Sequence, residues 1–459
     1  MAGHFDFEGI SVERFYHFIC KTDEPLFELL RELGIFNRMR WRETSMGFFN
    51  EGRLHPWGDP LSLLRFPSLS ILSKIRYGLF AFVCVRRNRW DAIENETAKS
   101  WITRWCGLAV YERFWRPLLQ HKFHEYSDTV SAQWIWTRIR RIGRSRKSLL
   151  QEELGYLEGG SKTLIDALAD AIESRGGKLH LGEAALEVTS VNGKVTGVRT
   201  SKGFLPADFV ISTMPTPLVS QVVPSLPDDW KARYDAIQNI GVICVVLKLR
   251  RSVTPHFWVN IAEDDMDIPG VIEFTNLRNV GEDTIVYVPY YMPVTHEKFS
   301  WPEDRLLDEA FGCLQRLNPK LQADDVLSTR VARLRHGQPV CDAGFAAKVP
   351  PIQTPIHGLQ IADTCFYYPE DRGLSESIYM GCDMARALAG PLVHASEAPA
   401  GRHSIPMRNP HPSIMEDVPV TEGAHEPRFT VSVVEEVTAL DPSDTETVSN
   451  LPNAKQKRP

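Results

Sequence analysis

Residues 155–215 constrain the fold more than any other segment of this 459-residue chain. Gly159-Gly160 leads into Ser161, which we predict as the N-cap of a helix because its hydroxyl can accept a hydrogen bond from the first helical turn. We expect this helix to end at the glycines 176–177, because glycine adopts the left-handed conformation that ends helices easily. Between these points, apolar residues recur at helical spacing, at Leu164, Leu168 and Ile172.

Four predicted strands follow this helix. The first covers residues 178–181. Residues 186–191 and 194–200 flank Asn192-Gly193, a residue pair that type I′ turns favour, and therefore form a hairpin. The fourth strand, 207–213, is short and apolar. A helix, a strand, a hairpin and a strand in this order predict a dinucleotide-binding sheet with an inserted β-ribbon.

Turn residues also organise the first 60 residues. Two short strands are expected on either side of Glu8-Gly9, and a helix that begins at Glu24 ends before Gly34, a typical C-cap residue. Residues 47–56 alternate in polarity as a hairpin does. From about 60 to 150 the pattern is helical and rich in Trp and Arg. We interpret its tryptophans as core residues: Trp101, Trp105, Trp115, Trp134 and Trp136.

The second half of the chain alternates strands and helices. Strands are predicted at 242–249 and 284–291, and a helix at 304–317 follows them. This arrangement indicates a second domain on the substrate side. Another strand at 358–363 and a helix at 375–389 come next.

The charges of the chain bear on its partners. The net charge of -6 argues against nucleic acid, which requires a basic surface. Local charge is less even, because residues 74–147 hold sixteen Lys and Arg but six Asp and Glu. A solvated helical face is the favoured interpretation of this segment. The alternatives are contact with an anionic substrate or with an acidic lipid surface.

The eight cysteines form no CxxC pair and show no metal-ligand spacing, so we predict no metal site. Unpaired cysteines and the absence of a signal peptide indicate a reduced, cytoplasmic protein. The longest apolar run, residues 77–85, is much shorter than the ~20 residues that cross a membrane. A buried helix is the favoured interpretation of this run, and shallow, peripheral membrane contact is the second.

The run GLQIADTCFYYPEDRGLSESIYMGCDMA, residues 358–385, resembles the last FAD-binding motif of the superfamily of amine oxidases, protoporphyrinogen oxidases and phytoene desaturases. In that motif a strand ends at an acidic residue, a loop crosses the diphosphate, and a helix begins under the flavin. The resemblance implies that Asp363 binds the ribityl chain. It also implies that Leu374 and Ser375 present backbone N–H groups to the flavin, and that Arg372 and Gly373 shape the turn. The alternative for Asp363 is a cap at the strand end.

Residues 156–215 resemble the central FAD segment of the same superfamily. By this resemblance, Ala185 contacts the adenine through its backbone, and Gly159-Gly160 lets the backbone pass close to the flavin or the substrate. A plain turn into a helix is the alternative for the two glycines. Residues 5–18 resemble a segment that borders the active site, which places Tyr16 and His17 near the flavin. A structural histidine is the alternative for His17.

The superfamily also has a glycine-rich G-x-G-x-x-G unit that grips the FAD diphosphate, and this unit does not occur in the sequence. We expect it to lie before residue 1, for one of three reasons: a start codon placed too late, a truncated derivative, or a partner that supplies the segment. FAD binding by the chain alone is then expected to be weak, because each missing charge-assisted hydrogen bond contributes about 1.5–3 kcal/mol.

These observations predict an α/β fold, in which an N-terminally truncated, FAD-binding Rossmann-like domain is combined with a mixed α+β substrate domain. The FAD-binding domain is expected to consist of residues 1–20, 151–215 and 336–392. The substrate domain is expected to consist of a helical part, 21–150, and a sheet, 216–335. Residues 393–459 are rich in Pro, Glu, Ser and Thr, and we interpret them as a disordered tail.

The resemblance implies an FAD-dependent oxidoreductase that takes hydride from an apolar small molecule, isoprenoid or otherwise lipid-like. The sequence identifies no catalytic residue, which agrees with a flavin that performs the redox chemistry itself. One alternative is a flavin-dependent mutase similar to UDP-galactopyranose mutase, in which the basic segment holds a sugar diphosphate. Another is an inactive, truncated remnant. The oligomeric state is not predicted.

Overall fold

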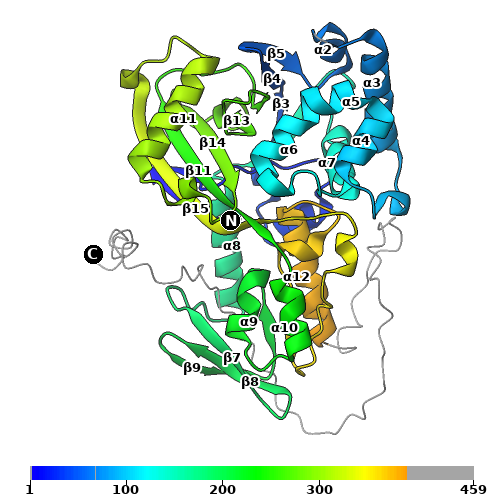
Figure 1. The fold of residues 1–459 in the computed structure, drawn as a ribbon. Helices are drawn as coiled ribbons and strands as arrows, with labels where there is room; N and C mark the ends of the chain where they lie inside the picture. The colour runs from blue at the N-terminus through cyan, green and yellow to red at the C-terminus, as the bar shows by residue number, and fades with distance from the viewer. Residues whose placement is uncertain (1–2, 68, 390–459) are drawn as a thin grey trace, which may run out of the picture.

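The computed structural model describes residues 3–67 and 69–389, and three parts of the chain are distinct in it (Figure 1). One part is a mixed sheet, the second is a group of helices beside that sheet, and the third, below both in Figure 1, holds helices and a β-ribbon. The chain passes between these parts several times. Each part therefore combines segments that are far apart in the sequence.

The mixed sheet has seven strands. Their order is β15 (Val326–Pro339), β11 (Asn239–Leu249), β14 (Thr284–Met292), β13 (Gly270–Glu273), β12 (Trp258–Ile261), β4 (Met46–Asn50) and β5 (Arg53–Trp57). Helix α11 (Glu303–Leu317) packs its apolar side chains on β11 and β14, which explains why both strands are almost continuously buried. β4 runs parallel to β12, with Met46 opposite Trp258, so a hairpin from the start of the chain completes the sheet.

The group of helices contains α2 (Pro60–Arg65), α3 (Ile71–Arg86), α4 (Ala98–Cys106), α5 (Leu108–Val110), α6 (Arg116–Phe123) and α7 (Ala132–Arg144). Side-chain oxygens accept hydrogen bonds from the first turns of four of them, and the capping residues are Asp59, Ser70, Thr97 and Ser131. These caps supply partners for N–H groups that have none within the helix, which is why the helices begin there. The buried rings of Phe80 and Trp101, 4.6 Å apart, pack α3 against α4.

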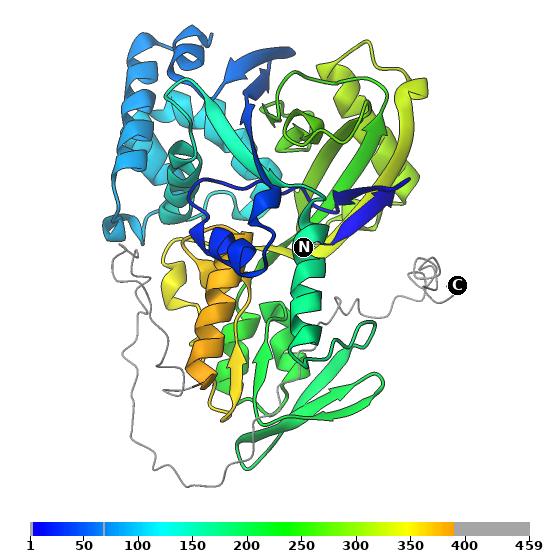
Figure 2. The same cartoon turned by 180° about the vertical axis from the view of Figure 1, so that it is seen from behind.

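The third part contains α8 (Ser161–Ser174), the ribbon of β7 (Ala185–Val191), β8 (Lys194–Thr200) and β9 (Gly203–Pro206), and the helices α9 (Val219–Val222), α10 (Asp228–Asp235) and α12 (Leu374–Ala389). Among the described residues, its parallel sheet consists of β10 (Val210–Ser212) and β16 (Leu359–Ile361). Helix α1 (Glu24–Glu32) packs beside α12, as the view from behind shows (Figure 2).

Two further strand pairs connect these parts. β1 (His4–Phe7) and β2 (Ile10–Glu13) form a hairpin, and β3 (Met39–Thr44) pairs with β6 (Glu152–Leu157). Glu13 at the end of β2 accepts a hydrogen bond of 2.9 Å from the Ser161 N–H at the start of α8. Its other oxygen lies 3.5 Å from Arg278, and both side chains are buried. This buried ion pair therefore fixes the first hairpin against α8 and the mixed sheet.

The predictions that rest on turn residues are confirmed. The turns between β1 and β2, between β4 and β5, and between β7 and β8 contain Glu8-Gly9, Glu51-Gly52 and Asn192-Gly193, all with positive φ. Helix α1 stops just before Gly34, which has a φ of 70°. The predicted strands at 242–249 and 284–291 and the helix at 304–317 correspond to β11, β14 and α11.

Two local predictions are wrong. Ser161 is the first residue of α8, and Gly160, with a φ of 75°, is the N-cap. Since the Glu13 carboxylate accepts the Ser161 N–H bond, the helix start has an acceptor from elsewhere in the chain. Residues 178–181 form no named strand among the described residues; Leu179 makes only an isolated β-bridge, and Leu181 is exposed.

Other predictions differ in extent or remain open. The strand predicted at 207–213 is shorter, at Val210–Ser212, and β9 is an additional strand that the sequence analysis does not contain. The predicted tail, 393–459, lies outside the described residues. The N-terminal truncation and the predicted domain boundaries stay predictions.

Candidate active site

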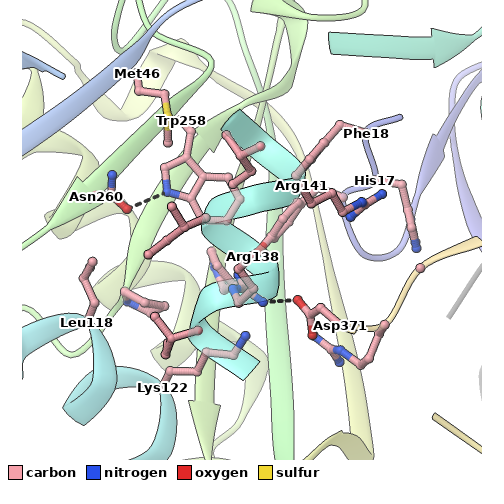
Figure 3. Close-up of a pocket in the computed structure, with 18 of the residues that line it drawn as sticks. His17, Phe18, Met46, Leu118, Lys122, Arg138, Arg141, Trp258, Asn260 and Asp371 are labelled. Atoms are coloured by element: carbon pink, nitrogen blue, oxygen red, sulfur yellow. Dashed lines mark hydrogen bonds and ion pairs between the residues drawn. The ribbon is translucent and has the colours of Figure 1, made fainter. Parts of the chain in front are cut away.

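A cavity of about 330 Å³ lies where the three parts of the chain meet (Figure 3). Its walls come from α3, α6 and α7, from β4, β11 and β12, and from the loops at residues 15–19 and 371–374. The cavity has two chemically different regions. One is an aromatic wall, and the other is a cluster of charged side chains.

The aromatic wall is a set of packed rings. Phe114 lies in its middle, with ring centroids 4.5 Å from Trp57, 5.3 Å from Phe48 and 5.4 Å from Tyr77. Trp258 lines another side, and its indole N–H donates a hydrogen bond of 3.1 Å to Asn260 (Figure 3). Contacts between aromatic rings contribute about 0.5–1.5 kcal/mol per pair beyond their burial. The wall is therefore held in place by its own packing.

The tryptophans predicted as core residues divide into two groups. Trp101 and Trp136 are buried, and Trp105 packs against the same core. Trp115 and Trp134 line the cavity. The core prediction is confirmed for all five, since Trp134 is buried in the same core and Trp115 packs against it, and these two also face the cavity.

Residues with charged side chains line the opposite region of the cavity: Lys122, Arg138, Arg141, Arg372, Asp23, Glu152 and Asp371. Arg138 donates to Asp371 Oδ2. Arg141 donates to both carboxylate oxygens of Asp23, at 2.8 and 3.3 Å. Two of the arginines are therefore compensated by two carboxylates. Glu152 is buried and accepts a 2.8 Å hydrogen bond from the Thr44 hydroxyl.

Lys122 has a different environment. Its ammonium lies over the rings of Trp134, Tyr291 and Phe123, at 5.0, 5.1 and 5.6 Å from their centroids. Within the described part of the chain, it makes no hydrogen bond and no ion pair. Burial, and then the positive charges of Arg138 and Arg372, hold the pKa of Lys122 well below its usual value. The cavity therefore contains a lysine without a carboxylate partner among the described residues, and an anion beside it would favour its charged form.

Tyr16 and His17, which the sequence predicts near the flavin, both line this cavity. The Tyr16 hydroxyl lies 3.4 Å from that of Tyr291, and burial raises the pKa of Tyr16 well above its usual value. Burial lowers the pKa of His17 to about 4. Both side chains are therefore uncharged at neutral pH and are able to exchange hydrogen bonds without adding charge.

The loop before α12 brings Arg372, Gly373 and Leu374 to the same cavity, as the resemblance implies. Ser375, the next residue, lies outside the cavity and is buried. Four buried side-chain atoms around this loop have no hydrogen-bond partner in the described structure: His17 Nδ1, Asp371 Oδ1, Ser375 Oγ and Glu376 Oε2. An unpaired buried polar atom costs about 1–3 kcal/mol, so such a group of them indicates a place for a polar ligand. These residues fit a flavin edge at the start of α12.

Asp363 does not line the cavity. One of its oxygens accepts a hydrogen bond of 2.8 Å from the Cys365 N–H, and the other accepts bonds from the N–H and hydroxyl of Thr216, at 2.6 and 2.5 Å. These contacts make Asp363 a strand-end cap, the role that the sequence analysis kept as its alternative. Its contact with a ribityl chain stays a prediction. Tyr367, four residues later, donates a 3.0 Å hydrogen bond to Ser377 and so connects this strand end to α12.

Ala185 and the two glycines lie elsewhere. Ala185 begins β7 and pairs with Thr200 in the ribbon. Gly160 lines a second cavity, of about 30 Å³, together with His17 and Leu374. A Cβ atom on Gly160 would lie 2.6 Å from the side chains of Glu13 and Arg278, and one on Gly159 would collide with Thr163. The glycines thus allow protein groups to approach closely, and their contact with flavin or substrate stays a prediction.

Within residues 3–67 and 69–389, no three His, Cys, Asp or Glu side chains gather where they could hold a metal ion. No described helix has both the length and the apolar character that crossing a membrane requires.

The sequence analysis missed most of the charged cluster. The solvated-face interpretation of residues 74–147 is wrong for Lys122, Arg138 and Arg141, which all face the cavity. One signal was present in the sequence. Trp134, Arg138 and Arg141 follow one another at spacings of four and three residues, so one face of α7 carries both an aromatic ring and cations.

Comparison with solved structures shows the fold. A protein from Exiguobacterium sp. 255-15 assigned as a protoporphyrinogen oxidase has a TM-score of 0.63 at 16% identity, over 84% of this chain and 89% of that chain. A reduced UDP-galactopyranose mutase has a TM-score of 0.62 at 17% identity, over 83% of this chain and 85% of that chain. A putrescine oxidase bound to putrescine has a TM-score of 0.63 at 14% identity, over 84% and 90%.

Comparison with curated proteins finds no match. The sequence model described as flavin containing amine oxidoreductase matches residues 2–351, which is more than half of the chain. That match includes most of the cavity wall and the segment that carries Tyr16 and His17. The chain is therefore an FAD-dependent oxidoreductase and belongs to the family of flavin-containing amine oxidoreductases.

Proposed function

We propose that this enzyme oxidises an apolar, lipid-like small molecule by transferring hydride from a carbon or C–N position to FAD. One observation supports the proposal above all. A single cavity extends from the aromatic wall around Phe114 to residues 372–374, the loop that the resemblance assigns to the flavin edge. An apolar molecule packed on that wall would therefore reach the flavin.

When bound, FAD supplies the chemistry by accepting the hydride. The chain's own residues would hold and orient the two reactants. Backbone N–H groups of Leu374 and Ser375, at the start of α12, would hold the flavin carbonyl edge, because a helix N-terminus favours negative charge. Phe48, Trp57 and Phe114 would exclude water from the substrate, since burying apolar surface is favourable.

Sugar-nucleotide isomerisation is the alternative, and one feature favours it. The cations of the charged cluster could hold a diphosphate. However, Phe48, Trp57, Tyr77 and Phe114 offer hardly any hydrogen bonds to sugar hydroxyls. We therefore favour the apolar substrate.

The test uses the purified full chain. We expect it to bind added FAD, and we expect farnesol to bleach the visible flavin absorption under anaerobic conditions, with oxidised isoprenoid as the product. UDP-galactopyranose is the comparison substrate and should remain unchanged with the chemically reduced protein. A protein that binds no FAD even when FAD is added in excess, or one that isomerises the sugar nucleotide and leaves farnesol untouched, would overturn the proposal.

We also propose that the enzyme contacts membranes peripherally, through α2 and α3. Exposed apolar side chains gather there: Leu61, Leu64, Ile71, Leu72, Ile75, Leu79 and Phe82. Their spacing on α3 places them on one helix face, whereas Tyr77, on the other face, lines the cavity. Ile71 is 72% exposed and Leu72 is 66% exposed, which is unusual for a contiguous apolar surface.

The charge of the same segment favours an anionic lipid surface. Residues 61–89 contain six Lys and Arg and no Asp or Glu. A helix with an exposed apolar face and basic flanks binds at the interface of anionic bilayers. α3 lies at the outer edge of the molecule in both views, so a flat surface could approach it (Figures 1 and 2).

Sedimentation with vesicles tests this contact. We expect binding to phosphatidylcholine vesicles that contain phosphatidylglycerol, and much less to phosphatidylcholine alone. The double change Ile75→Glu and Leu79→Glu should abolish it. Leu181→Glu with Phe204→Glu, two exposed apolar residues of the third part, is the matched control and should bind normally. Equal binding by the two double variants contradicts the proposal, and so does a wild-type protein that ignores both kinds of vesicle.

A further inference from the structure

The charged region of the cavity carries more positive than negative charge. Four cationic side chains line it, against the carboxylates of Asp23, Glu152 and Asp371. Asp23 is bound by Arg141, and Asp371 is bound by Arg138. Burial raises the pKa of Glu152, and its carboxyl receives a hydrogen bond from Thr44. Lys122, Arg138 and Arg372 lie together in this region, and Lys122 is the one for which the described residues provide no carboxylate.

Lys122 is held in this position by apolar and aromatic neighbours. Its ammonium faces three aromatic rings, and the described residues provide no carboxylate for it. Arg138 stands over the ring of Trp134, 4.6 Å away, which is one of the three rings that Lys122 contacts. Two cations on one indole repel each other, and a protein rarely keeps a buried cation unpaired. An anion between them would relieve the repulsion.

We propose that Lys122, Arg138 and Arg372 bind the anionic group, a carboxylate or a phosphate, of a substrate whose remaining body is apolar. This inference deepens the proposed function and rests on it, because the apolar body occupies the aromatic wall around Phe114. Arginine guanidinium groups suit both anions, since their N–H groups match two oxygens at once. Lys122 adds a point charge that no carboxylate among the described residues neutralises.

The same charges exclude a substrate that enters this region with its amine. A cationic head group would meet Lys122 and Arg372, and the Asp371 carboxylate in this region is already occupied by Arg138. Lys122 lies on α6 and Arg138 on α7, both outside the segments that resemble FAD-binding motifs. Two of the three proposed ligands therefore belong to the group of helices, whereas Arg372 lies in the loop that the resemblance assigns to the flavin edge. The anionic end of the substrate would then point toward residues 372–374.

Binding of four probes with the same chain length tests the inference. Dodecanoate, dodecyl phosphate, dodecanol and dodecylamine are titrated below micelle formation into the purified full chain, and the fluorescence of the cavity tryptophans reports binding. We expect the better of the two anions to bind at least about tenfold more tightly than dodecanol, with a tenfold ratio equal to about 1.4 kcal/mol. Dodecylamine should bind most weakly. The ratio of carboxylate to phosphate affinity identifies the natural anion.

Two variants locate the site. Lys122→Met, which suits the surrounding rings, should weaken binding of the anions about tenfold and leave dodecanol within about twofold of wild type. Lys122→Arg should restore part of the preference. Lys99→Met is the matched control, because Lys99 is exposed, pairs with Asp128 and lies outside the cavity; it should change nothing.

The outcomes separate this inference from the proposed function. Equal affinity for dodecanol and both anions, tighter binding of dodecylamine, or a Lys122→Met protein that keeps its preference for anions would overturn the anion site, while the apolar cavity would stand. If none of the four probes binds, both the anion site and the apolar substrate are overturned. The flavin content of the protein is measured separately by its visible spectrum.

Discussion

Arg138 on α7 forms an ion pair with Asp371, in the loop that leads into α12. The pair joins the group of helices to the part of the chain that the resemblance assigns to FAD. Both residues also line the cavity, and Asp371 Oδ1 remains buried without a partner in the described structure. The position of this loop at the cavity therefore depends on an electrostatic contact between two parts of the molecule.

Breaking this pair should destabilise the protein measurably. We expect Arg138→Met or Asp371→Asn to lower the free energy of unfolding by about 1–3 kcal/mol, because each leaves the other, half-buried partner unpaired. The double variant should lose less than the sum of the two single losses. Urea unfolding measures these values. Arg89→Met is the control, since Arg89 and Asp91 form an exposed pair whose loss should cost under about 1 kcal/mol. Equal losses in Arg138→Met and Arg89→Met would contradict a structural role for the cavity pair.

Glu376 should make the stability of the protein depend on pH at values above those at which a glutamate carboxyl ordinarily titrates. Burial raises its pKa from 4.5 to about 7. The unfolded chain therefore loses this proton at lower pH than the folded chain, so stability declines from pH 4.5 to about 7 and stays lowered above that. Glu376→Gln has no proton to lose. It should be more stable than wild type by up to about 3 kcal/mol at pH 8 and close to it at pH 4.5, as measured by urea unfolding. A constant difference between the two proteins would show that burial of this carboxyl is not the cause.

His17 should have the opposite effect on stability, which it lowers as the pH falls. Burial lowers its pKa from 6.5 to about 4. As the pH falls below 6.5, the unfolded chain binds a proton at this histidine, whereas the folded chain binds it only near pH 4. Stability is therefore lost between pH 6.5 and about pH 4. We expect His17→Gln to lose less stability than wild type between pH 7 and pH 4, by up to about 3 kcal/mol. Thermal unfolding at these two pH values measures the difference. Parallel losses in wild type and variant would refute the prediction.

Gly160 should tolerate no side chain. It has a positive φ, and a Cβ atom there would lie within 2.6 Å of the buried Glu13–Arg278 pair. Gly176 also has a positive φ, but nothing lies within 4 Å of its Cβ position. We expect Gly176→Ala to cost about 1 kcal/mol for its backbone conformation alone. Gly160→Ala should cost about 3 kcal/mol or more, because it also disturbs a buried ion pair. Similar unfolding free energies for the two variants would show that the pair adapts without cost.

Some of the residues that the family motifs single out lie together in space, and their contact with flavin stays a prediction. Tyr16, His17 and residues 372–374 come from opposite ends of the sequence and line one cavity, as the resemblance implies. Asp363, Ala185 and Ser375 lie outside it. The motifs predict backbone paths well, but they do not say whether a carboxylate such as Asp363 is already used by neighbours such as Thr216, because those neighbours belong to other segments.

What the sequence determined alone is the local structure whose cause is also local. Asn192-Gly193 forms its turn because of the conformations that these two residues prefer, and Ser131 caps α7 because its hydroxyl reaches the next N–H groups. What only the tertiary structure decided is pairing between distant segments: β4 beside β12, Glu13 at the start of α8, and Lys122 near Arg372. The physical reason is that turns and caps depend on a few consecutive residues. A cluster of charges or a strand pair instead depends on which surfaces become buried together, and that is set only when the whole chain packs.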